Sequence, residues 1–384
     1  MNTTESFLYL SSCALSGEKP SLDEVDFDAL WQLSQSHNMT AFIAKALEGT
    51  KAFSRSGKAE QKRWSQALDS NINKTMLFNA ERARITGFME QNRIWHIPLK
   101  GAVINALYPG FGTREFADND ILYDGGFRAE VTRYMLDHGY KLTEDGFIAD
   151  AFTKAPSYNF EMHAKLFSCE DENDPRLCFY RGMLGRRKAV DGKKYAFEMA
   201  DDDFYIYFIL HAFKHYDNRG TGVRTLIDEY VLLKSERFGF DFSGLDPELE
   251  KLGIRSFEGQ LRRLASALFD TPPEELCAAL KKLDPQESEM LRFMLSAGTF
   301  GKMRTLFIKE FQAVGGGKPS KAKYYLKRLF PDRSRYRYTN PFVYRHRAVY
   351  PFFLMYRMVV NPIKHRRSLK KELAAIKHIN ANNH

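Results

Sequence analysis

The hydrophobic pattern of this chain changes at Arg93, and that change limits the folds open to it. From there to residue 167, short strand-like runs are separated by helical ones. Strands that alternate with helices over so short a stretch predict a small sheet with helices packed on it. Gly139 is well placed to end the second of the helices. We expect strands at 94–99, 118–123 and 158–167, and helices at 102–108 and 127–138.

Helical periodicity occupies the sequence on both sides of this core. Apolar residues recur at three- and four-residue spacing over 26–47, 59–91, 201–216, 224–236, 259–269 and 273–283. The predicted fold class is therefore α+β or α/β, with a small mixed-sheet core flanked by N- and C-terminal helical domains. We expect a helical domain at 1–92, an α/β core at 93–200, a second helical domain at 201–314 and a basic tail at 315–384.

Composition excludes several classes of protein. The four cysteines are scattered and no two have CxxC spacing, so neither a disulfide framework nor a thiolate zinc site is expected. The N-terminus lacks a basic region before its short apolar run, and no uninterrupted apolar run is long enough to span a bilayer. We therefore expect a cytoplasmic protein without a signal peptide or a transmembrane segment.

Asp118 and Asp120 stand two positions apart in a predicted strand, so both side chains should leave the same face. Carboxylates held so close repel each other unless a cation lies between them. Their oxygens suit Mg²⁺ or Mn²⁺, with substrate phosphates completing the coordination. Glu161, on a later alternating strand, supplies a third carboxylate if the two strands are neighbours. On this interpretation, removing one aspartate relieves repulsion and leaves stability unchanged or higher.

Residues suited to holding phosphate stand near the acidic pair. Lys100-Gly101 ends the first predicted strand and opens a helix, where glycine allows close backbone approach and the first N–H groups are unpaired. Arg114, four residues before Asp118, has a guanidinium that can hold a phosphate bidentately. Each of these features alone is commonly a solvated strand end. The interpretation therefore depends on the order and spacing of all of them together.

These residues belong to a longer arrangement. The runs IPLKGAVINALYP, REFADNDILYD and FEMHAKLF follow one another, with Gly139-Tyr140 between the last two. This arrangement resembles the uncharacterised bacterial nucleotidyltransferase family often described as NTP-transferase-like, which belongs to the DNA polymerase beta-like nucleotidyltransferase superfamily. The later segments HAFKHYDNRGTGVRTLIDEYVLL, LFPDRSRYRY and YPFFLMYRMV are also similar to that family.

The resemblance implies a metal-dependent enzyme that moves a nucleotidyl group from an NTP to a hydroxyl or phosphate acceptor. It assigns metal binding to Asp118 and Asp120. It makes Glu161 the third acid, which either serves as the base for the acceptor or lies next to that base. The acceptor is not identified by the sequence: a sugar, another small molecule, RNA and protein all remain open.

Two departures from the family pattern open an alternative. Lys100 and Gly101 fall where the superfamily has a Gly-Ser pair that grips phosphate, and Ala102 lacks the hydroxyl. Asn119 stands between the aspartates, where the family favours an aliphatic residue. The alternative is a catalytically degenerate protein that binds a nucleotide without transferring any part of it.

Other residues are weaker candidates for nucleotide contacts. His163 lies two residues after the third acid and should share its face. His211 and His215 are four residues apart on a predicted helix, where they either share a metal or line the cleft. Arg224 and Asp228 have the same spacing, which is that of an ordinary helical ion pair, although the resemblance places both at the active-site cleft.

The C-terminal tail is strongly basic. In residues 318–384, Asp332 and Glu372 are the acidic residues among many lysines and arginines interleaved with tyrosines. Such a segment binds nucleic acid through phosphates and stacking, lies on an anionic membrane surface, or packs on the body with a solvated basic face. An accessory role through this tail is therefore a further alternative.

We expect the full-length protein to bind polyanions such as heparin, RNA or anionic vesicles, because the body neutralises only part of this charge. Binding should weaken steeply with salt. Truncation after Gly317 should remove it and leave NTP binding unchanged. Equal retention of the full-length and truncated proteins on a heparin column would show that the charge is used in packing.

Overall fold

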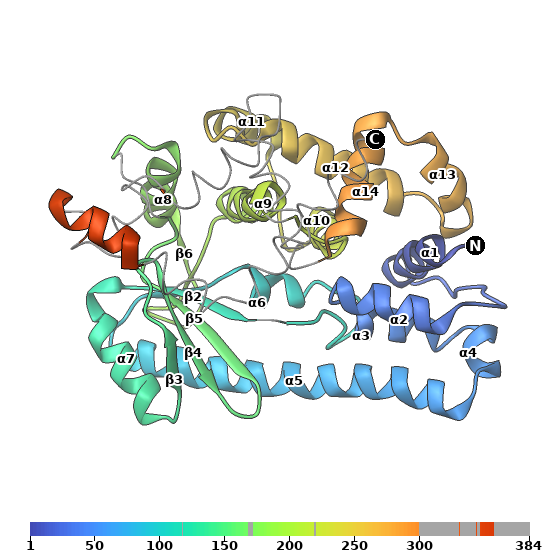
Figure 1. Ribbon diagram of the computed structural model, residues 1–384, viewed down its shortest axis with the longest axis horizontal. Helices are drawn as coiled ribbons and strands as arrows, with labels where there is room; N and C mark the ends of the chain where they lie inside the picture. The colour runs from blue at the N-terminus through green and yellow to red at the C-terminus, as the bar shows by residue number, and fades with distance from the viewer. Residues whose placement is uncertain are drawn as a thin grey trace. The chain divides into compact units, whose positions relative to one another are not determined.

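The computed structural model of the chain describes residues 1–116, 118–167, 172–218, 220–298, 330, 343 and 346–356 (Figure 1). The chain divides into two compact units, Met1–Lys214 with Thr221–Thr299 and His215–Gly220 with Phe300–His384. The sheet and the helices that position the candidate site belong to the first unit.

The N-terminal region is helical, as its periodicity predicts. A capping box between Asn2 and Glu5 begins the first helix, which precedes the predicted helical ranges. The predicted helix over 26–47 is instead two helices, because the chain turns at His37 and Asn38, whose φ is 50°. The helices of this region are α1 (Thr3–Ser16), α2 (Phe27–Ser36), α3 (Thr40–Leu47), α4 (Lys51–Arg55) and α5 (Lys58–Gln91).

A five-stranded mixed sheet forms the centre of the first unit, with strand order β1-β2-β5-β4-β3. Only β2 and β5 pair in parallel, while the other neighbours are antiparallel. Its strands and the intervening helices are β1 (His96–Pro98), α6 (Lys100–Asn105), β2 (Asn119–Tyr123), η1 (Gly125–Phe127), α7 (Arg128–Asp137), β3 (Lys141–Glu144), β4 (Ala149–Lys154) and β5 (Tyr158–His163). This architecture confirms the predicted α+β class.

The sheet has one apolar face, which packs on α5 and α7. Figure 1 shows α5 running along the sheet, and Gly139 ends α7 with φ 81°, as predicted. Alternate residues of β2, β4 and β5 point into this core, which leaves the intervening residues for the opposite face. The buried residues of the core are Ile85, Met89, Ile94, Ile121, Tyr123, Val131, Met135, Tyr140, Phe152, Phe160 and Met162.

A partly buried ion network around Glu81 ties α5 to the far strands of the sheet. Glu81 accepts hydrogen bonds from Tyr140 (3.0 Å), Lys154 (2.8 Å) and Arg84 (3.0 Å). Burial alone would raise the pKa of Glu81, but these donors outweigh it and lower the pKa. The network therefore holds the β3–β4 hairpin in a fixed position against the long helix.

Helices again follow the sheet. The predicted helix at 273–283 begins as a 3-10 turn, and the one at 259–269 starts earlier, at Arg255. The remaining elements of the first unit are α8 (Pro175–Arg186), β6 (Lys188–Ala189), β7 (Phe197–Glu198), α9 (Asp201–Asn218, whose end enters the second unit), α10 (Arg224–Lys234), α11 (Phe242–Lys251), α12 (Arg255–Phe269), η2 (Pro273–Glu275), α13 (Leu276–Lys282) and α14 (Pro285–Ala297).

The predicted basic tail lies mostly outside the described residues, which there comprise 330, 343 and 346–356 and include the turn η4 (Arg347–Val349). The polyanion-binding role thus stays a prediction. Among the residues that the structure describes, none of the helices has the length and apolar character required to cross a bilayer.

Two buried glutamates share one tyrosine between α9, α10 and α12. The Tyr205 hydroxyl lies 2.6 Å from Glu229 Oε1 and 2.9 Å from Glu258 Oε1, and Arg262 donates to the same Glu258 oxygen at 2.7 Å. One hydroxyl proton cannot serve both carboxylates. Burial and the charge of Glu258 raise the pKa of Glu229 to about 8, although the hydrogen bond from the Tyr205 hydroxyl lowers it in part, so Glu229 is protonated at neutral pH.

Glu229→Gln should therefore flatten the pH dependence of stability. The folded pKa, about 8, exceeds the ordinary value of 4.5, so the wild type loses stability between these values as pH rises. The loss is at most about 1.4 kcal/mol per pH unit. Chemical denaturation at several pH values should show the variant matching the wild type near pH 4.5 and exceeding it by about 2–4 kcal/mol at pH 8. Glu236→Gln, on the surface, is the control; parallel pH profiles of wild type and Glu229→Gln would contradict this account.

Candidate metal and nucleotide site

The parallel pairing of β2 with β5 sets Asp120 directly opposite Glu161. Both side chains leave the sheet on the face away from the α5 core, since their strand neighbours Ile121, Phe160 and Met162 belong to that core. Asp118 comes immediately before β2, which begins one residue later than predicted. The acids expected from the spacing are thus brought to neighbouring strands.

His163 joins the two carboxylates. Its Nε2 atom lies 3.5 Å from Asp120 Oδ1 and 3.6 Å from Glu161 Oε2. One ligand atom from each of the three residues lies within 4.8 Å of the others, a spacing that a single metal ion can bridge. Glu161 is the most exposed of the three, with 40% of its side chain accessible. This carboxylate therefore faces the opening of the site.

Opposite charges, rather than repulsion alone, govern the ionisation of Asp120. Its burial would raise its pKa, but Lys100 and His163 outweigh that effect and lower the pKa to about 2. Burial would in turn lower the pKa of His163, whereas Asp120 and Glu161 raise it to about 9. The cationic partners of Asp120 argue against the expectation that its removal leaves stability unchanged or higher, and the stability of such a variant stays a prediction.

Asp118 is in a different electrostatic position. Burial and the charge of Asp120 both raise its pKa, and Lys100 lowers it only in part. Its carboxylate is not one of the three ligand atoms grouped around His163, among the described residues searched for such groups. Asp118 thus lies near enough for the charge of Asp120 to raise its pKa, but its carboxylate is outside the group of ligand atoms that lie within 4.8 Å of one another.

Lys100, the first residue of α6, reaches across the site. Its ammonium lies 3.5 Å from Asp120 Oδ2 and 2.8 Å from His211 Nε2 on α9. Gly101 has room for a Cβ, whose nearest neighbours would be at 3.9 and 4.0 Å, so packing does not demand glycine there. The role predicted for this glycine, which is to let phosphate approach the backbone closely, stays a prediction.

Sequence reasoning missed Tyr207, one turn before His211 on α9. It is buried, and its pKa is raised well above the ordinary value by burial and by the charges of Asp120, Asp118 and Glu161. A tyrosine in an apolar helix face gives no sign of this position, because the proximity arises only when α9 is folded against the sheet. The Tyr207 side chain therefore lies close to the three acids.

Asn119, the residue that departs from the family pattern, is buried on the opposite side of β2 from the acids. Its Oδ1 accepts a hydrogen bond of 2.9 Å from Arg82, whose other terminal nitrogen donates to Asn79 at 2.7 Å. An amide here is therefore held by a side chain of α5, where an aliphatic residue would be held by packing alone. The strand keeps a buried anchor, contrary to what the substitution suggests.

Arg114 has a buried partner on α10. It is buried and forms a bidentate pair with Asp228, Nε to Oδ1 at 2.8 Å and Nη2 to Oδ2 at 2.9 Å. The Tyr108 hydroxyl donates to the same Oδ1 at 2.7 Å. Asp228 therefore engages the Nε and Nη2 atoms, while Nη1 lies 3.9 Å from where a Cβ at Gly101 would stand, and phosphate binding by Arg114 stays a prediction. Arg114 also anchors the loop before β2 to α10.

Arg224 and Asp228 likewise differ from the simple helical pair. Asp228 bonds Arg114, while Arg224 donates to the Glu115 carbonyl at 3.0 Å. The charge of Arg224 also lowers the pKa of Asp118 in part, so its guanidinium lies on the side of the acids. His215 is in the last turns of α9 and belongs to the second unit, and its role stays a prediction.

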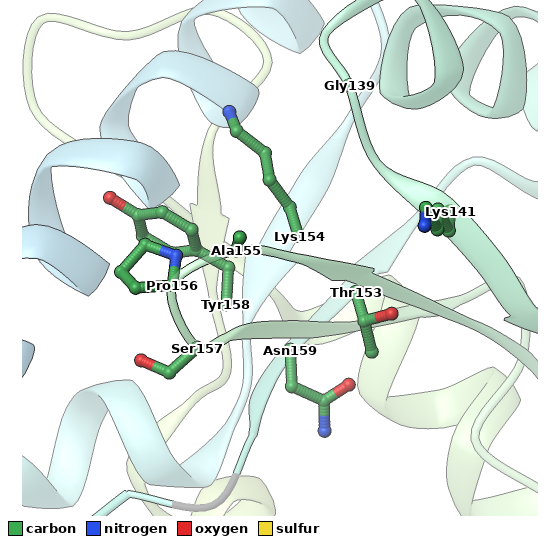
Figure 2. Close-up of a pocket in the computed structure, with 9 residues that line it drawn as sticks. All are labelled: Gly139, Lys141, Thr153, Lys154, Ala155, Pro156, Ser157, Tyr158 and Asn159. Carbon is green, nitrogen blue, oxygen red and sulfur yellow. The ribbon is translucent and has the colours of Figure 1, made fainter.

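A pocket of about 570 Å³ lies at the turn between β4 and β5 (Figure 2). Figure 2 shows Lys154 and Tyr158 pointing to one side of the hairpin and Thr153 and Asn159 to the other. The acids are not among its lining residues, which are Gly139, Lys141, Thr153, Lys154, Ala155, Pro156, Ser157, Tyr158 and Asn159. The pocket is therefore separate from the acidic group.

The donor set at the acids fits a divalent cation. Two carboxylates converge beside His163, and Asp120 Oδ1 is buried without a hydrogen-bond partner. Buried polar atoms without partners cost free energy, which a bound cation or a substrate group would recover. Hard oxygen donors favour Mg²⁺ or Mn²⁺.

Comparison with known proteins agrees with this geometry. Residues 23–270 match the model of a family described as uncharacterised nucleotidyltransferases. The chain belongs to this family. The match confirms the resemblance drawn from the LKG, Arg and DxD runs and covers the sheet, the acids and α9 and α10. No curated protein and no solved structure gave a significant match.

Membership of the uncharacterised nucleotidyltransferases supports nucleotidyl transfer as the general activity. The C-terminal runs that resemble the family, from LFPDRSRYRY onward, lie beyond the matched residues, and their role stays a prediction. The family description specifies neither a metal nor an acceptor.

Proposed function

We propose that this protein is a Mg²⁺- or Mn²⁺-dependent nucleotidyltransferase that moves a nucleotidyl group from an NTP to a hydroxyl or phosphate acceptor. The observation that carries the proposal is the register of β2 against β5, which places Asp120 opposite Glu161 with His163 between their carboxylates. This site does not identify the acceptor, which could be a sugar, another small molecule, RNA or a protein.

The roles of the residues follow from their positions. Asp120 and Glu161 would hold the metal, with Asp118 at its edge, and His163 would keep the two carboxylates oriented. The bound metal would neutralise charge on the leaving pyrophosphate and activate the attacking group. Glu161, the exposed carboxylate, is best placed to accept the proton of an incoming hydroxyl.

Lys100 and Arg224 are the cations best placed for the phosphate-binding role, while Asp228 engages one edge of the Arg114 guanidinium. Lys100 stands beside Asp120, and Arg224 lies on the side of Asp118, so these two cations flank the acids. The helix α6 begins at Lys100, and the free backbone N–H groups of its first residues would add donors for phosphate. Gly101 would allow phosphate to approach that backbone, although Ala102 brings no hydroxyl.

The test is transfer of label from α-labelled NTPs. Incubated with Mg²⁺ and candidate acceptors, the wild type should release pyrophosphate and move the label to the acceptor. Glu161→Gln should lose both activities, whereas Glu144→Gln, at an exposed site on β3, should retain them. Release of labelled nucleoside diphosphate with inorganic phosphate would point to hydrolysis instead. Tight Mg²⁺-dependent NTP binding without any turnover would favour the nucleotide-binding pseudoenzyme, the alternative that Ala102 raises.

A further inference from the structure

The ammonium of Lys100 occupies the side of Asp120 that His163 leaves free. Asp120 Oδ1 faces His163, while Oδ2 faces Lys100 at 3.5 Å. Both charged side chains are largely buried, with 17% of Lys100 and 8% of Asp120 accessible. A second contact, 2.8 Å to His211 Nε2, holds the ammonium in this place. Lys100 thus places a positive charge beside Asp120.

A divalent cation cannot bind Asp120 without affecting this arrangement. Two positive groups on one carboxylate repel each other, and partial burial strengthens that repulsion over its value in water. Lys100 has a flexible four-carbon stem, so its ammonium can move while its backbone stays in α6. The phosphates of a nucleotide are the anionic groups at hand to receive it, since ammonium groups bind phosphate as point charges.

We propose that Lys100 is an exchangeable cation, bound to Asp120 in the absence of metal and transferred to the nucleotide phosphates when metal binds. This inference rests on the proposed function of the site. It gives Lys100 two opposed effects, because it competes with the metal for Asp120 but attracts the nucleotide. The exchange keeps the acids neutralised in both states, and it favours loading of metal and nucleotide together over metal alone.

Binding measurements on Lys100→Met separate this role from a structural one. Mn²⁺ alone, titrated by calorimetry, should bind the variant about tenfold more tightly than the wild type, because one nearby positive charge is gone. A labelled non-hydrolysable NTP in saturating Mn²⁺, followed by equilibrium dialysis, should bind about tenfold more weakly. A lysine that served only the fold would weaken both when removed.

Lys100→Gln provides a second variant, since its amide keeps a polar contact to Asp120 and His211 without the charge. It should shift both affinities in the same directions as Lys100→Met. Lys45→Met removes an exposed lysine paired with Glu48 and should change neither. Thermal melting before titration identifies any variant that has not folded.

The outcomes separate the two proposals. Tighter Mn²⁺ with weaker nucleotide in both Lys100 variants supports the exchange. If the wild type binds both ligands but the Lys100 variants bind Mn²⁺ equally or more weakly, the exchange is overturned. The proposed function then remains. A wild type that binds neither Mn²⁺ nor the nucleotide overturns the proposed function and the exchange with it.

Discussion

Asp120→Asn should abolish metal-dependent nucleotidyl transfer while the protein remains folded. The carboxylate lies opposite Glu161 and within reach of both His163 and Lys100, so an amide removes the charge around which the site is arranged. We expect pyrophosphate release to fall by about a thousandfold or more, of the order seen when one group that stabilises transition-state charge is lost. Asp137→Asn, on the exposed end of α7, should retain full activity.

The same substitution should lower stability modestly. The folded pKa of Asp120, about 2, is below the ordinary value of 3.8, so its ionised form contributes stability above pH 3.8 that is lost as pH falls through about 2. At neutral pH the cost of Asp120→Asn should be about 1–2 kcal/mol, measured by urea denaturation without metal. A variant more stable than the wild type would show that repulsion from Asp118 dominates after all.

Asp228→Asn should destabilise the protein by about 3–5 kcal/mol, because it leaves Arg114 buried without a compensating charge. Arg114 and Asp228 are only 6% and 8% accessible, and the pair joins the loop before β2 to α10. Burial would raise the pKa of Asp228, yet Arg114 outweighs it and lowers the pKa, so the charged pair is the stable form. Urea denaturation at neutral pH measures the effect.

Asp246→Asn is the matched control, because Asp246 pairs with Arg255 on the surface, where both side chains are about 40% accessible. Exposed pairs contribute roughly 0–1 kcal/mol, so this variant should unfold almost as the wild type does. If Asp228→Asn also stays within about 1 kcal/mol of the wild type, the buried pair does not stabilise the fold, contrary to this account.

Local sequence patterns predicted the elements whose periodicity is strong. The helix expected at 59–91 is α5 almost to the residue, and the alternating run after Tyr158 is β5. The strand β3 was missed because its side chains, from Lys141 to Glu144, are all exposed and show no apolar alternation. An edge strand of this kind forms through pairing with β4, which a local pattern does not contain.

In the candidate site too, local patterns predicted some features, and contacts between distant parts of the chain were missed. Spacing within one strand and alternation within another were enough to place Asp120 opposite Glu161, provided that the strands are neighbours. The pair between Arg114 and Asp228 was missed because Asp228 is distant in the sequence and reaches Arg114 only through the packing of α10. The contact of Asn119 with Arg82 was missed for the same reason.

The position of a bound metal tests the central claim most directly. Crystals grown with Mn²⁺ and a non-hydrolysable NTP should show an anomalous-scattering peak between the carboxylates of Asp120 and Glu161. The triphosphate should lie against that peak, with the Lys100 ammonium moved from Asp120 to a phosphate oxygen. A nucleotide bound elsewhere on the protein, or one bound beside these acids without Mn²⁺, would contradict the account.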